Sequence, residues 1–133
     1  MKTYKLFISQ PMVDKTDKEI ELARTRAINT ALNQVKRLYN ESNAQIEIID
    51  SFIKDAPHDA KPVWYLAKSI EFLSNANIIF FAKGWNEYRG CKIENTIAHE
   101  YLEKEGAIII KNNFVGLIIL RTRNPPWRKR YVQ

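Results

Sequence analysis

The residue that stands out chemically is Glu94, which follows the glycine-bearing loop 84–90 and opens an amphipathic pattern. If that pattern is helical, Glu94 shares one face with Cys91, Ala98 and Tyr101. A carboxylate on such an apolar face costs free energy unless it is paired or used in chemistry. A poised carboxylate can attack the anomeric carbon of a sugar or stabilise oxocarbenium character there. The alternative is an acid in the first helical turn, where the helix dipole favours negative charge.

Further candidates come from loops that should meet at one edge of a sheet. These loops span residues 9–15, 51–61 and 83–90, and each follows a predicted strand. Ligands of open α/β sheets bind at the carboxyl ends of the strands. The candidates besides Glu94 are Ser9, Gln10, Asp50, Asp55, His58, Asp59, Trp85, Asn86 and Arg89.

Three of these candidates have competing interpretations. Trp85 could stack on a planar base or could cap the end of the sheet. Arg89, near a helix N-terminus, could hold a phosphate or could pair with Glu87 or Glu94. His58 is more typical of a solvated loop histidine than of a catalyst.

Apolar periodicity predicts the elements that must position these residues. Strands are expected at 4–9, 45–50, 77–82, 107–111 and 114–120. Helices are expected from a capping box at Thr16 and Glu19 to about residue 39, over 62–73, and over 93–102 with an end near Gly106. Asn112-Asn113 is expected to form a turn. The alternation of strands and helices predicts a parallel sheet with helices on both faces.

The composition fits a single domain over residues 1–120, followed by a basic, aromatic tail over residues 121–133. The chain has 133 residues and a net charge of +6. The tail holds five cations and no acid, so subtracting these five leaves +1 for residues 1–120. A short basic tail is more often a solvated or interface-packing terminus than a nucleic-acid site. Nucleic acid is therefore not an expected partner.

Other classes of protein are disfavoured by what the sequence lacks. No apolar run approaches the roughly 18 residues that a membrane span needs, so no membrane association is expected. The single cysteine, Cys91, suits a reducing cytoplasm, and residues 1–5 read into a strand instead of a signal peptide. No P-loop, dinucleotide glycine fingerprint, nucleophile elbow or zinc spacing occurs, so neither a metal nor an organic cofactor is expected.

Two motifs together resemble a known family. Phe7-Ile8-Ser9-Gln10-Pro11-Met12 closes the first predicted strand, and Lys83-Gly84-Trp85 to Arg89-Gly90-Cys91-Lys92-Ile93-Glu94 follows the third. These segments resemble the nucleoside 2-deoxyribosyltransferase-like superfamily, and most closely a branch of small domains common in bacteria and their phages. The resemblance covers residues 4 to about 111.

The resemblance implies a flavodoxin-like three-layer sandwich with a mostly parallel five-stranded sheet, and self-association into a homo-oligomer. It places Glu94 at the position of the family's catalytic glutamate, which attacks C1′ of a deoxyribonucleoside before a second base or water takes the sugar. The partner would be a small-molecule nucleoside or nucleotide. The residues implied in binding it are Ser9, Gln10, Pro11, Met12, Trp85, Asn86, Arg89 and Gly90.

The chain departs from the family's pattern at four positions. Phe7 stands where members often carry tyrosine, and Gln10 replaces a usual glycine. Ser69 stands where many members have an aspartate that helps to protonate the leaving base. Tyr88 replaces a small residue of the phosphate-contacting loop.

Without that aspartate, the protein could cleave slowly, use another acid such as Asp59 or His58, or bind without turnover. General acid catalysis contributes about 10²–10⁴ in rate, so its loss need not abolish activity. The sequence therefore predicts a nucleoside or nucleotide N-glycosidic bond enzyme, transferring or hydrolysing, with Glu94 as nucleophile. The alternative is a non-catalytic nucleotide-binding or sensing module using the same cleft. In a third, weaker hypothesis the tail contacts nucleic acid or a neighbouring subunit.

Overall fold

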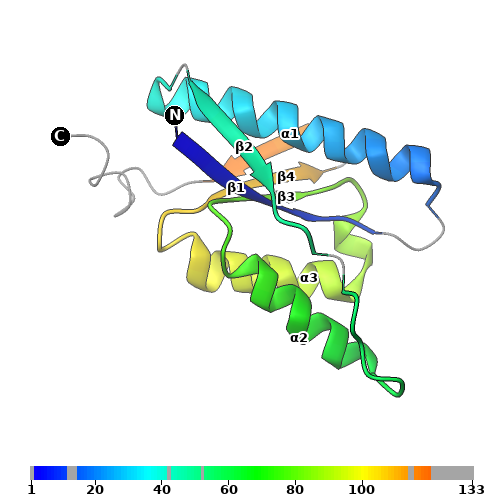
Figure 1. Ribbon diagram of the computed structural model, residues 1–133. Coiled ribbons are helices and arrows are strands. Elements are labelled where there is room, and N and C mark those ends of the chain that lie inside the picture. The colour runs from blue at the N-terminus through cyan, green and yellow to red at the C-terminus, as the bar shows by residue number, and fades with distance from the viewer. Residues whose placement is uncertain (1, 12–14, 42, 52, 114–115, 121–133) are drawn as a thin grey trace.

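Five short runs rich in isoleucine, leucine and phenylalanine form the central sheet. The computed structural model describes residues 2–11, 15–41, 43–51, 53–113 and 116–120. The strands are β1 (Lys2–Ser9), β2 (Ala44–Ile48), β3 (Ile78–Phe81), β4 (Ile108–Asn113) and β5 (Gly116–Leu120). Their order is β2-β1-β3-β4-β5, and neighbouring strands are parallel except β4 and β5 (Figure 1). The predicted α/β fold with a mostly parallel five-stranded sheet is confirmed, and it is consistent with a flavodoxin-like sandwich.

Helices cover both faces of the sheet, as predicted. Helix α1 (Asp17–Tyr39) lies on one face, and α2 (Pro62–Leu73) and α3 (Arg89–Ile97) lie on the other (Figure 1). The capping box starts α1: the Thr16 hydroxyl accepts the Glu19 N–H at 3.1 Å, and the Glu19 carboxylate accepts the Thr16 N–H at 3.2 Å. Among the described residues, no helix is long and apolar enough to cross a membrane.

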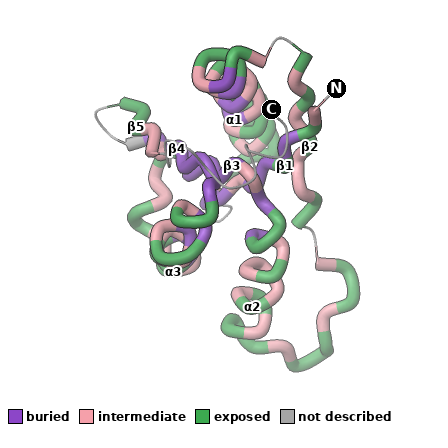
Figure 2. The backbone as a smooth tube through the Cα atoms, turned by 90° about the vertical axis from the view of Figure 1, so that its left-hand side faces the viewer, coloured by how far each residue is buried: buried purple, intermediate pink, exposed green. Residues whose placement is uncertain are grey.

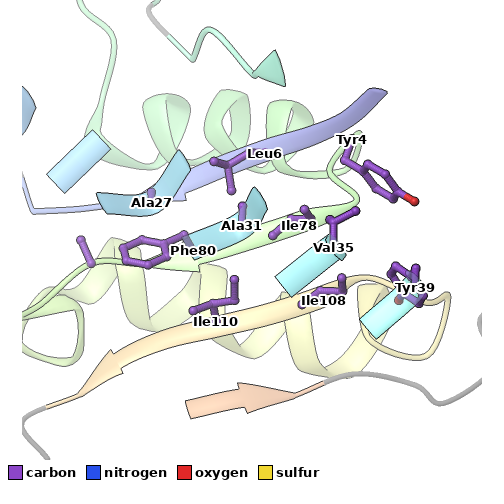
Figure 3. Packing of buried hydrophobic residues seen from close by; sticks show 11 residues of the cluster. Tyr4, Leu6, Ala27, Ala31, Val35, Tyr39, Ile78, Phe80, Ile108 and Ile110 are labelled. Carbon is purple, nitrogen blue, oxygen red and sulfur yellow. The ribbon is translucent and has the colours of Figure 1, made fainter. Parts of the chain in front are cut away.

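The core on the α1 face combines small helix residues with large strand residues. Ala27, Ala31 and Val35 recur every four residues along α1, and all three are fully buried. They pack against alternate residues of three strands (Figure 3), which are Leu6, Ile78, Phe80, Ile108 and Ile110. The intervening strand residues point to the other face. These residues are Phe7, Ile79, Phe81 and Ile109. On that face they pack with Leu73 of α2 and with Ala98, which follows α3.

The edge of the sheet differs from the sequence prediction. The predicted turn at Asn112-Asn113 is wrong, because both residues extend β4 and pair with Leu117 and Gly116. Residues 114–115, where the fifth strand is predicted to begin, lie outside the described part of the chain. Only these two residues join the strands, whereas a parallel crossover needs a dozen or more, so β5 runs antiparallel to β4.

One consequence is an uneven covering of the two faces. Figure 2 shows the strands end-on, with α1 above β1 and β3 and with α2 and α3 below the sheet. A parallel β4–β5 connection would bring a further helix, and the hairpin removes it. Within the described ranges, no helix lies above β4 and β5 on the α1 face.

Helix α3 begins earlier than predicted and leads into a wider turn. It starts at Arg89, so Glu94 lies in its second turn. Residues Ala98–Leu102 form one π-helical turn, which takes more residues than an α-helical turn. The inward position therefore moves from Tyr101, which is 66% exposed, to Leu102, which is 7% exposed. The prediction that Tyr101 shares the buried face of Glu94 is wrong for this reason.

Truncating Leu102 to alanine is expected to lower the free energy of unfolding by about 2–4 kcal/mol, because it opens a cavity in the core. The same change at Tyr101 should cost less than about 0.5 kcal/mol, because that side chain is in solvent. Urea denaturation of both variants, with the m-values compared, measures the difference. A larger loss for Tyr101→Ala than for Leu102→Ala would contradict the π-helical turn.

Candidate functional site

Three elements bring three polar side chains together beneath the sheet: Ser9 at the end of β1, Ser69 on α2 and Glu94 on α3. The Ser9 hydroxyl donates to Oε1 of Glu94 at 2.8 Å, and the Ser69 hydroxyl donates to Oε2. Glu94 is 6% exposed, so hydroxyl groups replace water as the donors to both oxygens. The carboxylate is thereby held in one orientation by residues far apart in sequence.

Local structure explains this convergence. Alternation along β1 turns Ser9 away from α1 and toward the face that carries α2 and α3. On α2, Ser69 lies one turn before Leu73, which is the buried residue of that helix. Glu94 lies in the second turn of α3 and is buried, so the alternative of a first-turn acid placed by the helix dipole is wrong.

The cluster lies where the strand order reverses. Strand β1 has β2 on one side and β3 on the other, and open α/β sheets bind ligands in the crevice at such a point. Past the end of β1, Gln10 is half-buried and Pro11 is buried, while Met12 lies outside the described residues. After β3, Gly84 adopts a φ of 89°, and a Cβ there would lie 3.8 Å from Cγ of Pro11. The loop after β1 and the loop after β3 therefore lie close together.

Burial sets the protonation behaviour of the cluster. It raises the pKa of the Glu94 carboxyl above its ordinary value of 4.5, and hydrogen bonds from Ser69 and Ser9 offset part of the rise. Burial also raises the pKa of the Cys91 thiol; a hydrogen bond with Ser9 lowers it, and the charge of Glu94 raises it. Cys91 therefore stays a neutral thiol at neutral pH, and Glu94 is the group that ionises first.

Replacing Glu94 by glutamine is expected to stabilise the fold near neutral pH. The folded protein binds the Glu94 proton more tightly than the unfolded chain does, so wild-type stability falls as the pH rises from 4.5 through the raised pKa. For each tenfold by which the folded protein binds this proton more tightly, the free energy of unfolding of wild type falls by about 1.4 kcal/mol over this pH range. At about pH 7.5, urea denaturation should give a higher free energy of unfolding for Glu94→Gln than for wild type. At about pH 4 the two free energies should be equal. A glutamine variant less stable than wild type at pH 7.5 would contradict the raised pKa.

Trp85 lies half-buried beyond the end of β3. Its ring centroid is 5.4 Å from that of Phe81, at 55°, and the Lys111 ammonium lies 5.5 Å from the indole centroid. The indole packs against the core between the sheet and α3. These contacts match the capping interpretation, and stacking on a bound base stays a prediction.

The remaining candidates around the start of α3 leave space for a ligand. Asn86 and Arg89 are exposed, and in the described structure Arg89 forms no ion pair with either acid near it in sequence. Tyr88 precedes the helix, and its side chain makes no capping hydrogen bond. A Cβ at Gly90 would meet no atom within 4 Å, so the first turn borders open space.

The alternative acids are not brought to the carboxylate. His58 and Asp59 are exposed in the connection before α2. This connection extends beyond the N-terminal end of α2 (Figure 1), whereas Ser69 lies seven residues, or about 10 Å, into the helix. Across the described residues, no hydrogen bond or ion pair joins His58 or Asp59 to Glu94. The arrangement does not support their use as the missing acid.

A groove on the opposite face of the sheet is absent from the sequence-based predictions. It has a volume of about 1410 Å³ and lies between α1 and the part of the sheet that has no helix above it. Phe80, Ala82 and Asn112 form its floor. Glu94 does not line it, but at the carboxyl edge it reaches four of the predicted site residues, Gln10, Pro11, Trp85 and Asn86.

No protein-family model matches the chain, and no curated protein matches its sequence. The site is therefore interpreted from its own geometry. Its defining feature is a desolvated carboxylate held by two serine hydroxyls at the switch point of the sheet.

Proposed function

We propose that the protein acts on the N-glycosidic bond of a nucleoside, deoxynucleoside or 5′-monophosphate, with Glu94 as nucleophile. One observation carries the proposal: the buried Glu94 carboxylate has each oxygen fixed by a serine from a different element. A carboxylate held in one orientation loses little conformational entropy when it reacts. The motif resemblance adds the substrate class.

In the proposed reaction, one Glu94 oxygen bonds to C1′ of the sugar as the bond from C1′ to the base nitrogen breaks. The electron pair of that bond leaves with the base, which takes up a proton. A water molecule or a second base then attacks C1′, and the carboxylate leaves from the glycosyl-enzyme. The raised pKa makes ionised Glu94 a stronger base than an exposed glutamate.

Among the described residues, no second carboxyl or imidazole group contacts the Glu94 carboxylate that could supply a proton to the leaving base. Ser69 occupies the position where the resemblance implies an aspartate, and it donates its hydrogen bond to Glu94. The leaving base would then take its proton from solvent, which forfeits about 10²–10⁴ in rate. We therefore expect slow turnover and a preference for bases that leave without protonation.

The test is a chromatographic screen. Each deoxynucleoside, ribonucleoside and 5′-monophosphate is incubated with the protein, with and without a second free base, beside a Glu94→Gln control. Release or exchange of a base that vanishes in the control supports the proposal and identifies the substrate class. Base release that persists in the control would show that Glu94 is not the nucleophile.

The second candidate function is a non-catalytic nucleotide-binding or sensing module. It is favoured by the serine at position 69 and by the exposed positions of His58 and Asp59, so that neither of these two residues supplies an acid beside Glu94. Calorimetry that detects binding of a nucleotide, with no product formed over long incubation, would favour this function over catalysis.

The pH dependence of base release is expected to move to higher pH in Ser69→Ala. The hydroxyl lowers the pKa of Glu94, so its removal raises that pKa further. Because the nucleophile must be ionised, the rate rises with pH through this pKa. Rate profiles of wild type, Ser69→Ala and the control Ser74→Ala, an exposed serine after α2, measure the shift. A shift to lower pH would contradict the role of Ser69.

Two wider properties also belong to the proposal. Self-association and a cytoplasmic location follow from the motif resemblance and the single cysteine, and sedimentation of the purified chain tests the first. The basic tail, residues 121–133, is proposed to act as a solvated or interface-packing terminus. It lies outside the described residues, and its deletion should leave base release unchanged.

A further inference from the structure

The groove beneath α1 contains a largely buried polar residue, Asn112, whose side chain has no hydrogen-bond partner in the described chain. Asn112 lies two residues beyond Ile110 on β4, so alternation directs its side chain to the α1 face and onto the groove floor. It is 9% exposed, and its carboxamide forms no hydrogen bond with another described residue. Because Asn112 lines the open groove, its carboxamide faces that space with its hydrogen-bonding capacity unused by the described residues. A bound ligand could pair with it there.

The surroundings of Asn112 match a flat ring with a polar edge. Phe80 and Ala82 form an apolar floor beside it. A carboxamide presents a donor and an acceptor side by side, and this pair matches the edge of a nucleobase. Asn29 and Asn33 add two more carboxamides to the wall that α1 contributes.

The groove also carries more positive than negative charge, with three cations and two acids on its lining. Lys15, Arg26 and Lys83 line it, and none forms an ion pair within the described residues. Of the two acids that line it, Glu19 is held in the capping box of α1, and Glu87 is exposed at the rim. Unpaired lysine and arginine in a groove favour an anionic group such as a phosphate.

We propose that this groove is a nucleotide-binding site separate from the Glu94 cluster, with the base paired to Asn112 and the phosphate held by Arg26 and the two lysines. Its volume of about 1410 Å³ is above the ~300–1,000 Å³ usual for small-molecule sites, so a whole nucleotide fits. Because it lies on the opposite face of the sheet from Glu94, its occupancy does not depend on glycosidic chemistry.

The test is calorimetry on the full chain carrying Glu94→Gln, so that no ligand is consumed. The probes are adenosine, guanosine, cytidine and uridine 5′-monophosphates, the four matching nucleosides, and ribose 5-phosphate. At least one monophosphate should bind, and adding Asn112→Leu or Arg26→Ala should weaken it at least tenfold. The nucleoside should be sensitive only to Asn112→Leu, and ribose 5-phosphate only to Arg26→Ala. Arg24→Ala, which removes an exposed arginine of α1 outside the groove, should change nothing.

Thermal melting separates binding effects from folding effects. Asn112→Leu breaks no hydrogen bond within the described residues, so its melting temperature should stay close to that of its parent. If Asn112→Leu fails to fold, the proposal is tested by comparing the monophosphate affinity of Arg26→Ala with that of Arg24→Ala. Binding that is indifferent to Asn112 and Arg26 would overturn the proposal, and so would a folded protein that binds none of the monophosphates. If wild type released no base, only the proposed glycosidic activity would be contradicted, and the proposed nucleotide site in the groove would stand.

Discussion

Replacing Glu94 by glutamine is expected to lower the rate of base release by at least about 10³-fold, or about 4 kcal/mol of transition-state stabilisation. Glutamine keeps the volume of the side chain, and its carbonyl oxygen can still accept one of the two serine hydrogen bonds, while its NH2 group can donate to the other hydroxyl. It cannot form the bond to C1′ that the glycosyl-enzyme requires. Chromatography of released base under saturating substrate measures the loss.

A matched control comes from the turn after α3. The side chain of Glu100 is 65% exposed and lies 3.8 Å from Lys104, so Glu100→Gln removes the same charge from a site without chemistry. Its rate should equal that of wild type. A 2-fluoro nucleoside analogue, which slows release of the sugar from the enzyme, should leave the sugar on the peptide that contains Glu94. A labelled peptide elsewhere would show that another residue attacks.

Truncating Phe80 to alanine is expected to cost about 3–5 kcal/mol of the free energy of unfolding. The side chain is fully buried in the middle of β3, where it packs beneath Ala27 and Ala31 of α1 (Figure 3). Neighbouring strands fix its backbone on both sides, so the cavity cannot close by collapse. Because domains are stable by only about 5–15 kcal/mol, this loss is a large share of the total.

Urea denaturation of wild type and Phe80→Ala measures the loss in the free energy of unfolding, and an unchanged m-value shows that the two unfold in the same way. Val63→Ala serves as control, since Val63 is 67% exposed and its truncation should change stability by less than about 0.5 kcal/mol. A loss below about 1.5 kcal/mol for Phe80→Ala would mean that the α1 face of the core is loosely packed.

The elements that sequence predicted well are those in which several local signals agree. Helix α1 has a capping box at Thr16 and Glu19, an unbroken apolar stripe, and Asn40 as a left-handed end. The parallel strands are short apolar runs that neighbouring helices must cover on both sides. Helix α2 begins at Pro62, whose fixed φ and missing N–H suit a first turn.

The features that sequence did not predict depend on tertiary contacts or on chain length between elements. The direction of β5 follows from the two residues that separate it from β4. The predicted strands at 107–111 and 114–120 were also two residues apart, so that spacing would have been a usable signal for an antiparallel pair. The π-helical turn after α3 follows from packing Leu102 under the sheet, and no local residue pattern marks it. Because of this wider turn, Leu102 occupies the buried position at which the sequence predicted Tyr101.

The candidate site was predictable in part. Helical periodicity placed Glu94 on an apolar face, and the loop that follows the first predicted strand placed Ser9 at the carboxyl edge. Periodicity could not show that Ser69 meets the same carboxylate, because that contact depends on how α2 packs against α3. The groove was missed although α1 carries polar residues at helical spacing on one flank, including Arg26, Thr30 and Asn33. That stripe would have been a usable signal.

The direct hairpin between β4 and β5 has a consequence for the order in which the chain folds. Asn113 pairs with Gly116 across two residues, and hairpins form in about 1–10 μs. Leu6 pairs with Ile78, which lies 72 positions later, and that contact must first overcome loop-closure entropy. We therefore expect the C-terminal half to organise first and β1 to dock late. Glu94 would then gain its Ser9 contact only as folding completes.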